Sequence, residues 1–170
     1  MNLLALDTCD SRGSVSILRN GQVLQTVEHT TSDDYSIWLL PAIDCALQAS
    51  GLTFADVDVY VAASGPGSFT GVRVGLTTVK AWAEVTGKPI LGVSRLEALA
   101  TQAAPTAGEL VAAFTNAQRK QIFGALYRRS TDGAGDGKPE GEQKREEIKR
   151  VSVLACQSCL HGDKPTWRAQ

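Results

Sequence analysis

The chain has 170 residues, of which 43% are hydrophobic and 21% charged, with 17 Lys and Arg against 18 Asp and Glu. This apolar fraction is enough for a folded core and excludes a wholly disordered chain. Four cysteines are too few for a disulfide scaffold, and no segment approaches the roughly 20 consecutive apolar residues of a membrane helix. The apolar start, Met1–Leu6, lacks the basic region of a signal peptide, so we expect a cytoplasmic protein that does not bind a membrane.

The charge is distributed unevenly along the chain. Residues 1–110 carry 6 basic and 11 acidic side chains, whereas residues 111–170 carry 11 basic and 7 acidic ones. A net charge of −1 argues against non-specific binding of nucleic acid by the whole chain. This difference in charge indicates that the two parts of the chain are under different structural or functional constraints.

Three short strands are predicted at the N-terminus. Asn2–Leu6 is an apolar run that ends at Asp7, residues 14–18 alternate between polar and apolar, and Gln22–Thr30 returns as the next strand. The pair Asn20-Gly21 is typical of a two-residue hairpin turn, because both residues tolerate positive φ. We therefore expect an antiparallel meander.

Helices and strands alternate in the part that follows. Helical spacing over residues 36–50 and 72–86 predicts two helices, each followed by a glycine suited to end it. Strands are predicted at residues 57–63 and 89–93, and a third helix begins after Ser94. The resulting order, β-β-β-α-β-α-β-α, predicts an α/β sheet with helices on its faces, the order of a ribonuclease-H-like lobe.

The composition changes after this lobe, which we place at residues 1–108. Two further strands within residues 109–129 are predicted to begin a second lobe. Residues 130–141 contain four glycines, and residues 142–150 are almost wholly charged. We therefore predict a linker and a poorly structured tail over residues 130–170.

A glycine-rich turn lies between the fourth strand and the second helix. Three glycines within seven residues allow a sharp turn and free backbone amides, which suits binding of a phosphate or a carboxylate at the start of the helix. The alternative is a tight turn in which serine and threonine cap the helix, and the pattern is not that of a Walker A loop. The residues of this candidate site are Gly65, Gly67, Ser68, Thr70, Gly71, Arg73 and Gly75.

Residues suited to catalysis or metal binding are few. Asp7 ends the first strand, where actin-like ATPases and sugar kinases carry an Asp-x-Gly-Thr segment, but here Cys9 takes the place of the glycine. We favour a structural carboxylate at Asp7 over a metal ligand. Cys156, Cys159 and His161 supply only three of the four ligands that structural zinc requires. The sequence therefore predicts no catalytic residue and no metal site.

The first two predicted helices carry more apolar side chains than one buried stripe needs. A helix on a sheet requires a single apolar face, so the surplus indicates an interface with another protein. The alternative is that the two tryptophans merely cover the edge of the sheet. The candidate interface residues are Ile37, Trp38, Leu40, Leu76, Val79 and Trp82.

Three segments together resemble the TsaB (YeaZ) family. They are residues 4–8 (Leu-Ala-Leu-Asp-Thr), residues 65–75 (Gly-Pro-Gly-Ser-Phe-Thr-Gly-Val-Arg-Val-Gly) and residues 92–96 (Gly-Val-Ser-Arg-Leu). The resemblance covers about residues 1–129. It implies the actin-like ATPase superfold, made of two ribonuclease-H-like lobes. Because members of the family are longer, it also implies that the N-terminal lobe is complete and the second lobe truncated.

The same resemblance implies a function. The family acts in the synthesis of threonylcarbamoyladenosine in tRNAs that read codons beginning with A. A member is expected to be a non-catalytic scaffold and activator of TsaD, the transferase, which it contacts through the first two helices. TsaE, an ATPase, is expected to join the pair, and the isolated protein to self-associate through the same helices. No cofactor is expected within the chain, although a nucleotide at the partner interface stays open, and tRNA is expected to be contacted only indirectly.

Two alternatives stay open at this point. The first is an ATP-using phosphotransferase of the same superfold, against which Cys9 argues. The second is a tRNA-contacting module that uses Arg119, Lys120, Arg128 and Arg129, a small basic group with few aromatic residues for stacking.

Overall fold

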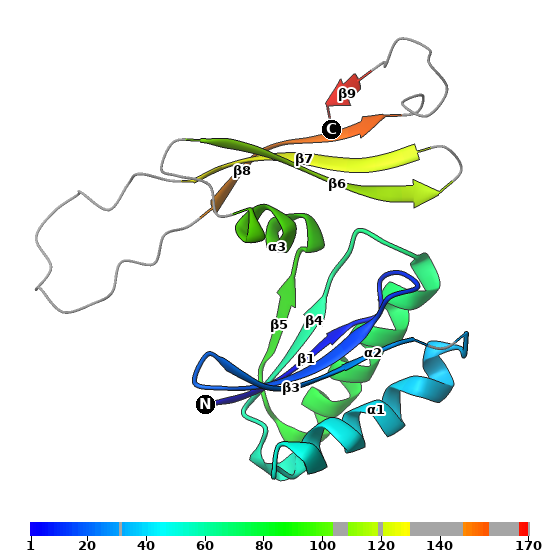
Figure 1. The fold of residues 1–170 in the computed structure, drawn as a ribbon, viewed down its shortest axis with the longest axis vertical. Coiled ribbons are helices and arrows are strands. Elements are labelled where there is room, and N and C mark those ends of the chain that lie inside the picture. Colours follow the sequence, from blue (N-terminus) through cyan, green and yellow to red (C-terminus); the bar gives the residue numbers. More distant parts are fainter. Residues whose placement is uncertain (31, 104–108, 119–120, 130–147, 157–166, 170) are drawn as a thin grey trace, which may run out of the picture. The chain divides into compact units, whose positions relative to one another are not determined.

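The computed structural model describes residues 1–30, 32–103, 109–118, 121–129, 148–156 and 167–169 (Figure 1). The chain divides into two compact units, residues 1–94 and 95–170. The boundary therefore precedes the third helix, where the sequence predicted it to follow that helix. The reason is packing, because this helix contacts the strands of the second unit.

The first unit contains a five-stranded sheet. Strands β1 (Asn2–Asp7), β2 (Ser14–Arg19) and β3 (Gln22–Glu28) form the predicted antiparallel meander, and β4 (Val59–Ala63) and β5 (Ile90–Val93) run parallel to β1. The strand order is β3-β2-β1-β4-β5. The Asn20-Gly21 turn has positive φ at both residues, 52° and 83°, which confirms the predicted hairpin. This mixed sheet with its helices confirms the ribonuclease-H-like, actin-like ATPase fold.

Two helices cover one face of this sheet. Helix α1 spans Tyr35–Ala49 and helix α2 spans Phe69–Thr86, which ends at Gly87 with a φ of 68°. Both are drawn on the same side of the strands in Figure 1. The core that they share with the sheet consists of Leu4, Leu6, Val15, Ile17, Leu39, Ala42, Ile43, Ala46, Leu47, Leu52, Val57, Tyr60, Ala62 and Val79.

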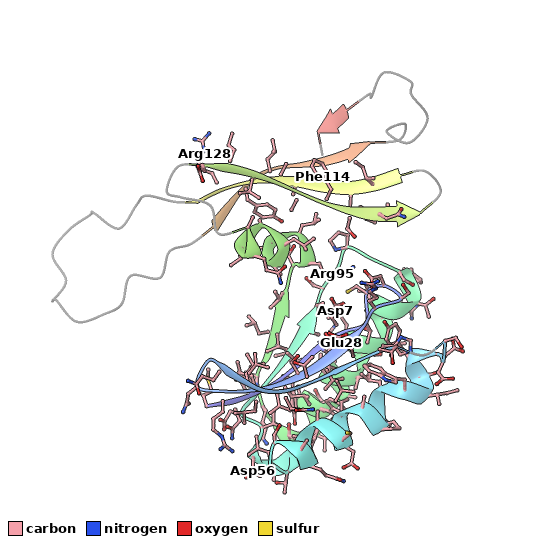
Figure 2. The ribbon with its side chains drawn as sticks, in the orientation of Figure 1. Asp7, Glu28, Asp56, Arg95, Phe114 and Arg128 are labelled. Carbon is pink, nitrogen blue, oxygen red and sulfur yellow. The ribbon has the colours of Figure 1, made fainter. Side chains whose placement is uncertain are left out.

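A 3₁₀ helix, Phe54–Asp56, connects α1 to β4. Asp56, labelled in Figure 2, accepts hydrogen bonds from the Thr53 hydroxyl (2.6 Å) and the Thr53 backbone amide (2.8 Å). The hydrogen bond from the Thr53 side chain holds the pKa of the exposed Asp56 carboxyl below its usual value. Lys88 also contacts this 3₁₀ helix, and its Nζ atom donates a hydrogen bond to the Ala55 carbonyl oxygen at 2.7 Å.

The second unit contains helix α3 (Arg95–Gln102) and an antiparallel sheet in the order β6-β7-β8-β9. The strands are β6 (Leu110–Gln118), β7 (Gln121–Arg129), β8 (Ile148–Cys156) and β9 (Trp167–Ala169). Helix α3 buries Leu96 and Ala100 against Ala113, Ala125 and Tyr127.

The strands β8 and β9 correct the prediction of a poorly structured tail. Strand β8 pairs with β7 from Ile122 to Arg129, and β9 pairs with β8. A strand bordered only by β6 leaves the hydrogen-bonding groups of its other edge unpaired, and a later segment can pair with them. Residues 151–154, with two valines and a leucine, have the β propensity for this pairing. The predicted linker at residues 130–147, and residues 157–166 of the tail, lie outside the described residues.

Within the part of the chain that the structure describes, no helix is long and apolar enough to cross a membrane.

Candidate interface on helices α1 and α2

The glycine-rich turn brings the start of α2 directly against the end of β1. A Cβ atom added to Gly67 would collide with Cys9, and one added to Gly71 would collide with the carbonyl oxygen of Thr8. A Cβ atom on Gly75 would lie 2.5 Å from the Thr8 Oγ1 atom. Gly67 and Gly71 therefore need glycine because two backbone segments approach closely, whereas the close contact at Gly75 is with a side chain.

Polar groups of the turn make hydrogen bonds within the protein. The Ser68 amide donates to the Cys9 carbonyl oxygen (2.5 Å), and the Gly71 amide donates to the Ser68 hydroxyl (3.4 Å), which caps α2. The Thr8 hydroxyl donates to the Gly71 carbonyl oxygen at 2.7 Å. Of the two interpretations that the sequence left open, these contacts favour the tight turn over the anion site.

The carboxylate of Asp7, at the end of β1, supports the local backbone (Figure 2). Its Oδ1 atom accepts a hydrogen bond from the Cys9 amide at 2.9 Å, which is the structural role that the sequence favoured. In the described part of the chain, no three His, Cys, Asp or Glu side chains are grouped as a metal site would require. The sequence candidates Cys159 and His161 lie outside that part, and the side chain of Cys156 is not described.

An aromatic cluster ties the beginning of α1 to the loop between β1 and β2. The Tyr35 hydroxyl donates to the Asp10 carbonyl oxygen. The buried His29 ring lies 4.6 Å from the Tyr35 ring, and its nitrogens lie 3.2 Å from the Ser11 carbonyl oxygen and 2.9 Å from that of Asp33. The sequence analysis missed this cluster although His29, Tyr35 and Trp38 are close in the chain, because the ring contacts depend on how the segment after β3 turns into α1.

The outer face of α1 is apolar at its first two turns. Ile37 is 69% exposed and Leu40 is 59% exposed, so both predicted interface residues are available to a partner. The third, Trp38, is only half-exposed, because it packs against the core and meets His29 edge-on at 4.9 Å. Pro41 and Cys45 extend the same exposed stripe along the helix.

Helix α2 corrects part of the predicted interface. Val79 is completely buried in the core, because the face of α2 that carries Gly71 and Gly75 turns toward β1. Leu76 and Trp82 are partly buried against the same core, and the Trp82 ring lies 5.0 Å from the Phe54 ring. Apolar residues occur on more than one side of α2, so the sequence pattern did not show which side of the helix faces the sheet.

The exposed face of α2 contains a residue pair that the sequence analysis did not assign to the interface. Phe69, the first residue of the helix, is 75% exposed, and the Arg73 guanidinium lies over its ring at 5.2 Å from the centroid. These two side chains line an open hollow of about 260 Å³ together with Thr70, Val74 and Thr77. The signal that could have revealed the pair is the i, i+4 spacing of an aromatic residue and an arginine.

The two helices differ in the charge that they expose. The exposed charges near α1 are acidic, from Asp33, Asp34 and Asp44, whereas α2 exposes Arg73 and Lys80 beside Glu84. Among the residues with described side chains, neither Arg73 nor Lys80 has a carboxylate within ion-pair distance. The surface therefore combines exposed apolar and aromatic side chains with an arginine, and aromatic residues and arginine are enriched at protein interfaces.

Comparisons with known proteins agree with this fold. The family model of tRNA N6-adenosine threonylcarbamoyltransferase (TsaD) matches residues 24–146. The tRNA threonylcarbamoyladenosine biosynthesis protein TsaB of Bacillus subtilis is 33% identical over 128 residues, or 75% of this chain and 56% of that protein. TsaB of Escherichia coli is 32% identical over 143 residues, or 81% and 59%. The chain thus spans less than three fifths of the length of these curated relatives.

A solved structure from Pseudomonas aeruginosa, described as a protein with similarity to peptidase YeaZ, matches with a TM-score of 0.70 and 28% identity. The match covers 91% of this chain and 65% of that one.

Proposed function

The chain belongs to the TsaB (YeaZ) family, and we propose that it acts in the synthesis of threonylcarbamoyladenosine in tRNA as a non-catalytic subunit. In this proposal it binds and activates a TsaD-type transferase in the cytoplasm, and a TsaE-type ATPase joins the pair. The names of the relatives support the pathway, and the exposed face of α1 and α2 supports the binding role.

The observation that carries the proposal is the apolar surface of α1 beside a well-filled core. Ile37 and Leu40 project away from the core that α1 forms with the sheet, so the fold of the first unit does not need them to be apolar. Burial of one such side chain contributes roughly 1.5–3 kcal/mol. Two of them at the centre of an interface are enough for a binding hot spot of about 2 kcal/mol or more.

The glycine-rich turn supports a non-catalytic role. In this superfold a nucleotide phosphate would need close approach to the backbone at the end of β1. Gly67 packs on Cys9 at that place, and the Tyr35 hydroxyl binds the following loop at the Asp10 carbonyl oxygen. These contacts weigh against the ATP-using phosphotransferase, and the proposal assigns no cofactor to the chain itself.

The tRNA-contacting alternative gains no specific support. Arg128 is exposed on β7 (Figure 2), but the side chain of Arg129 is not described, and Arg119 and Lys120 lie outside the described residues. We propose that the transferase contacts the tRNA and that this chain does so only indirectly.

Co-purification of the full chain with the TsaD-type subunit of the same organism tests the proposal. Leu40→Glu should abolish the complex, because the carboxylate would be desolvated at the interface. Val23→Glu is the matched control. Val23 is 61% exposed, and its β2 partner Leu18 follows the buried Ile17, so Val23 lies on the sheet face opposite the helices.

Both variants should keep the circular dichroism spectrum of the parent chain. Two results would contradict the proposal: a Leu40→Glu variant that binds as tightly as the parent, or sustained ATP turnover by the purified chain alone.

A further inference from the structure

We propose that strand β6 pairs with the β6 strand of a second copy of this chain. The two strands run antiparallel about a two-fold axis at Phe114, the middle residue of β6, and so join the sheets of two second units into one sheet. This inference concerns the second unit and does not rest on the proposed function.

Strand β6 lies at one edge of its sheet, whereas the corresponding strand of the first sheet does not. Strand β1 begins the meander β1-β2-β3 and is bordered on its second side by β4. Strand β6 begins the meander β6-β7-β8, and among the described strands only β7 borders it (Figure 1). The outer edge of such a strand presents hydrogen-bonding backbone groups that another strand can pair with. The second side of β6 is therefore a site for an added strand.

The sequence of β6 has none of the features that keep an edge strand from pairing. Its nine residues, Leu-Val-Ala-Ala-Phe-Thr-Asn-Ala-Gln, include no charged residue and no proline. The other edge strands differ, because β5 and β9 have only four and three residues and β3 ends at Glu28. Short strands and charged side chains are the common protection of sheet edges. Among the edge strands of the two described sheets, β6 therefore has the best properties for strand addition.

The side chains on one face of β6 are also available to a second copy. Ala113 is buried under α3 and Val111 packs against the same cluster, so the even-numbered residues of β6 lie on the opposite face. On that face Leu110 is 54% exposed and Phe114, labelled in Figure 2, is 46% exposed. Pairing about Phe114 places the two Phe114 rings opposite each other, and such an aromatic pair stabilises antiparallel strands.

A second copy covers this edge more completely than an unrelated strand does. Two-fold pairing uses the same edge of both chains, so it covers both edges at once and is closed. A single added strand would instead present its own outer edge to solvent. The antiparallel direction also brings opposite charges to each end of the pair. Glu109 precedes β6 in the sequence, and Arg119 and Lys120, which lie outside the described residues, follow it.

The dissociation constant of the dimer, measured by sedimentation of the full chain, tests the pairing. Position 112 of one copy faces position 116 of the other, so Ala112→Glu combined with Asn116→Glu sets like charges opposite each other twice. This variant should dimerise at least about 10-fold more weakly than the parent. Ala112→Lys combined with Asn116→Glu is the matched control, because it sets opposite charges at the same positions, and it should stay within about threefold of the parent. Both variants should keep the parent circular dichroism spectrum, since both positions are exposed.

A cysteine at the two-fold axis tests the register. Phe114→Cys, in a background with Cys45→Ser, Cys156→Ser and Cys159→Ser, should form a disulfide-linked dimer on mild oxidation. The reason is that a residue at the axis faces its own copy, with the two Cβ atoms close to the separation of a disulfide. Ala112→Cys in the same background is the control. It lies two residues from the axis, about 13 Å from its own copy, and should form far less of the linked dimer.

Three results would overturn the inference. They are a parent chain that stays monomeric, a double glutamate variant that dimerises like the parent, and a Phe114→Cys chain that forms no more linked dimer than the Ala112→Cys control. Leu40→Glu separates this pairing from self-association through the helices, because it should leave the β6 dimer unchanged. If Leu40→Glu abolishes the dimer, self-association runs through α1 and the inference is wrong. Binding to the TsaD-type subunit is a separate measurement, so the proposed function stands or fails independently of these results.

Discussion

Thr8 and Gly71 join the end of β1 to the first turn of α2. The Thr8 hydroxyl donates a 2.7 Å hydrogen bond to the Gly71 carbonyl oxygen, and the Thr8 carbonyl oxygen occupies the space that a Cβ atom on residue 71 would need. Because this contact sets where α2 begins, it also sets where Phe69 and Arg73 project from the helix.

Gly71→Ala should therefore destabilise the first unit. The new methyl group would meet backbone, which cannot rotate away, so we expect a loss of about 1–3 kcal/mol or more in the free energy of unfolding. Gly92→Ala is the control, since its Cβ atom would lie 3.8 Å from the Ser64 Cβ atom, an ordinary contact. Urea unfolding followed by tryptophan fluorescence in a Trp167→Phe background, which leaves only Trp38 and Trp82, reports on this unit. Equal stability of the two variants would argue against the close contact.

Val79 distinguishes a core position from an interface position on the same helix. Val79→Glu should unfold the first unit, because a carboxylate would be buried without a cation at a site with no exposed surface. Val79→Ala should cost roughly 2 kcal/mol and keep the fold. Circular dichroism of both variants is the measurement. A folded Val79→Glu variant that lost only partner binding would restore the interface role that the sequence predicted for this residue.

Local patterns predicted most of the first unit, because the causes of its turns and helix ends are local. Asn20-Gly21 and Gly87 both have the positive φ that their positions in the pattern indicated. Strand β8 was missed because its stability depends on β7, a partner more than ten residues away.

The candidate site was predicted less completely, for a similar reason. Apolar residues lie on more than one side of α2, so the sequence did not show that Val79 faces the core and Phe69 faces outward, as their burial in the structure does. The glycine-rich segment was correctly expected to start the helix. The reason for glycine at positions 67 and 71 is contact with Cys9 and Thr8, which lie far away in the sequence, so no local pattern could reveal it.

Tyr35→Phe tests whether the loop between β1 and β2 holds α1 in place. The change removes one hydrogen bond, to the Asp10 carbonyl oxygen, and should lower the free energy of unfolding by about 0.5–1.5 kcal/mol. Ser36→Ala, at an exposed position in the same turn, is the control and should change stability by less than about 0.5 kcal/mol. The comparison uses urea unfolding under identical conditions. A larger loss in the Ser36 variant would show that the tyrosine hydroxyl does not anchor the helix.

A chain that ends at Arg129 separates the stability of the two units. It removes β8 and β9, so β7 would lose the partner along its second edge, and the second unit should become less stable and prone to associate through that edge. The first unit has its own core, to which none of the described residues beyond Ala83 contributes, and should keep its melting temperature within about 3 °C, less than 1 kcal/mol for a unit of this size. Because Trp167 is deleted, near-ultraviolet circular dichroism of the shortened chain reports its tryptophans from the first unit alone. A drop of more than roughly 10 °C in that signal would mean that residues 130–170 support the first unit directly, contrary to the division of the chain after Ser94.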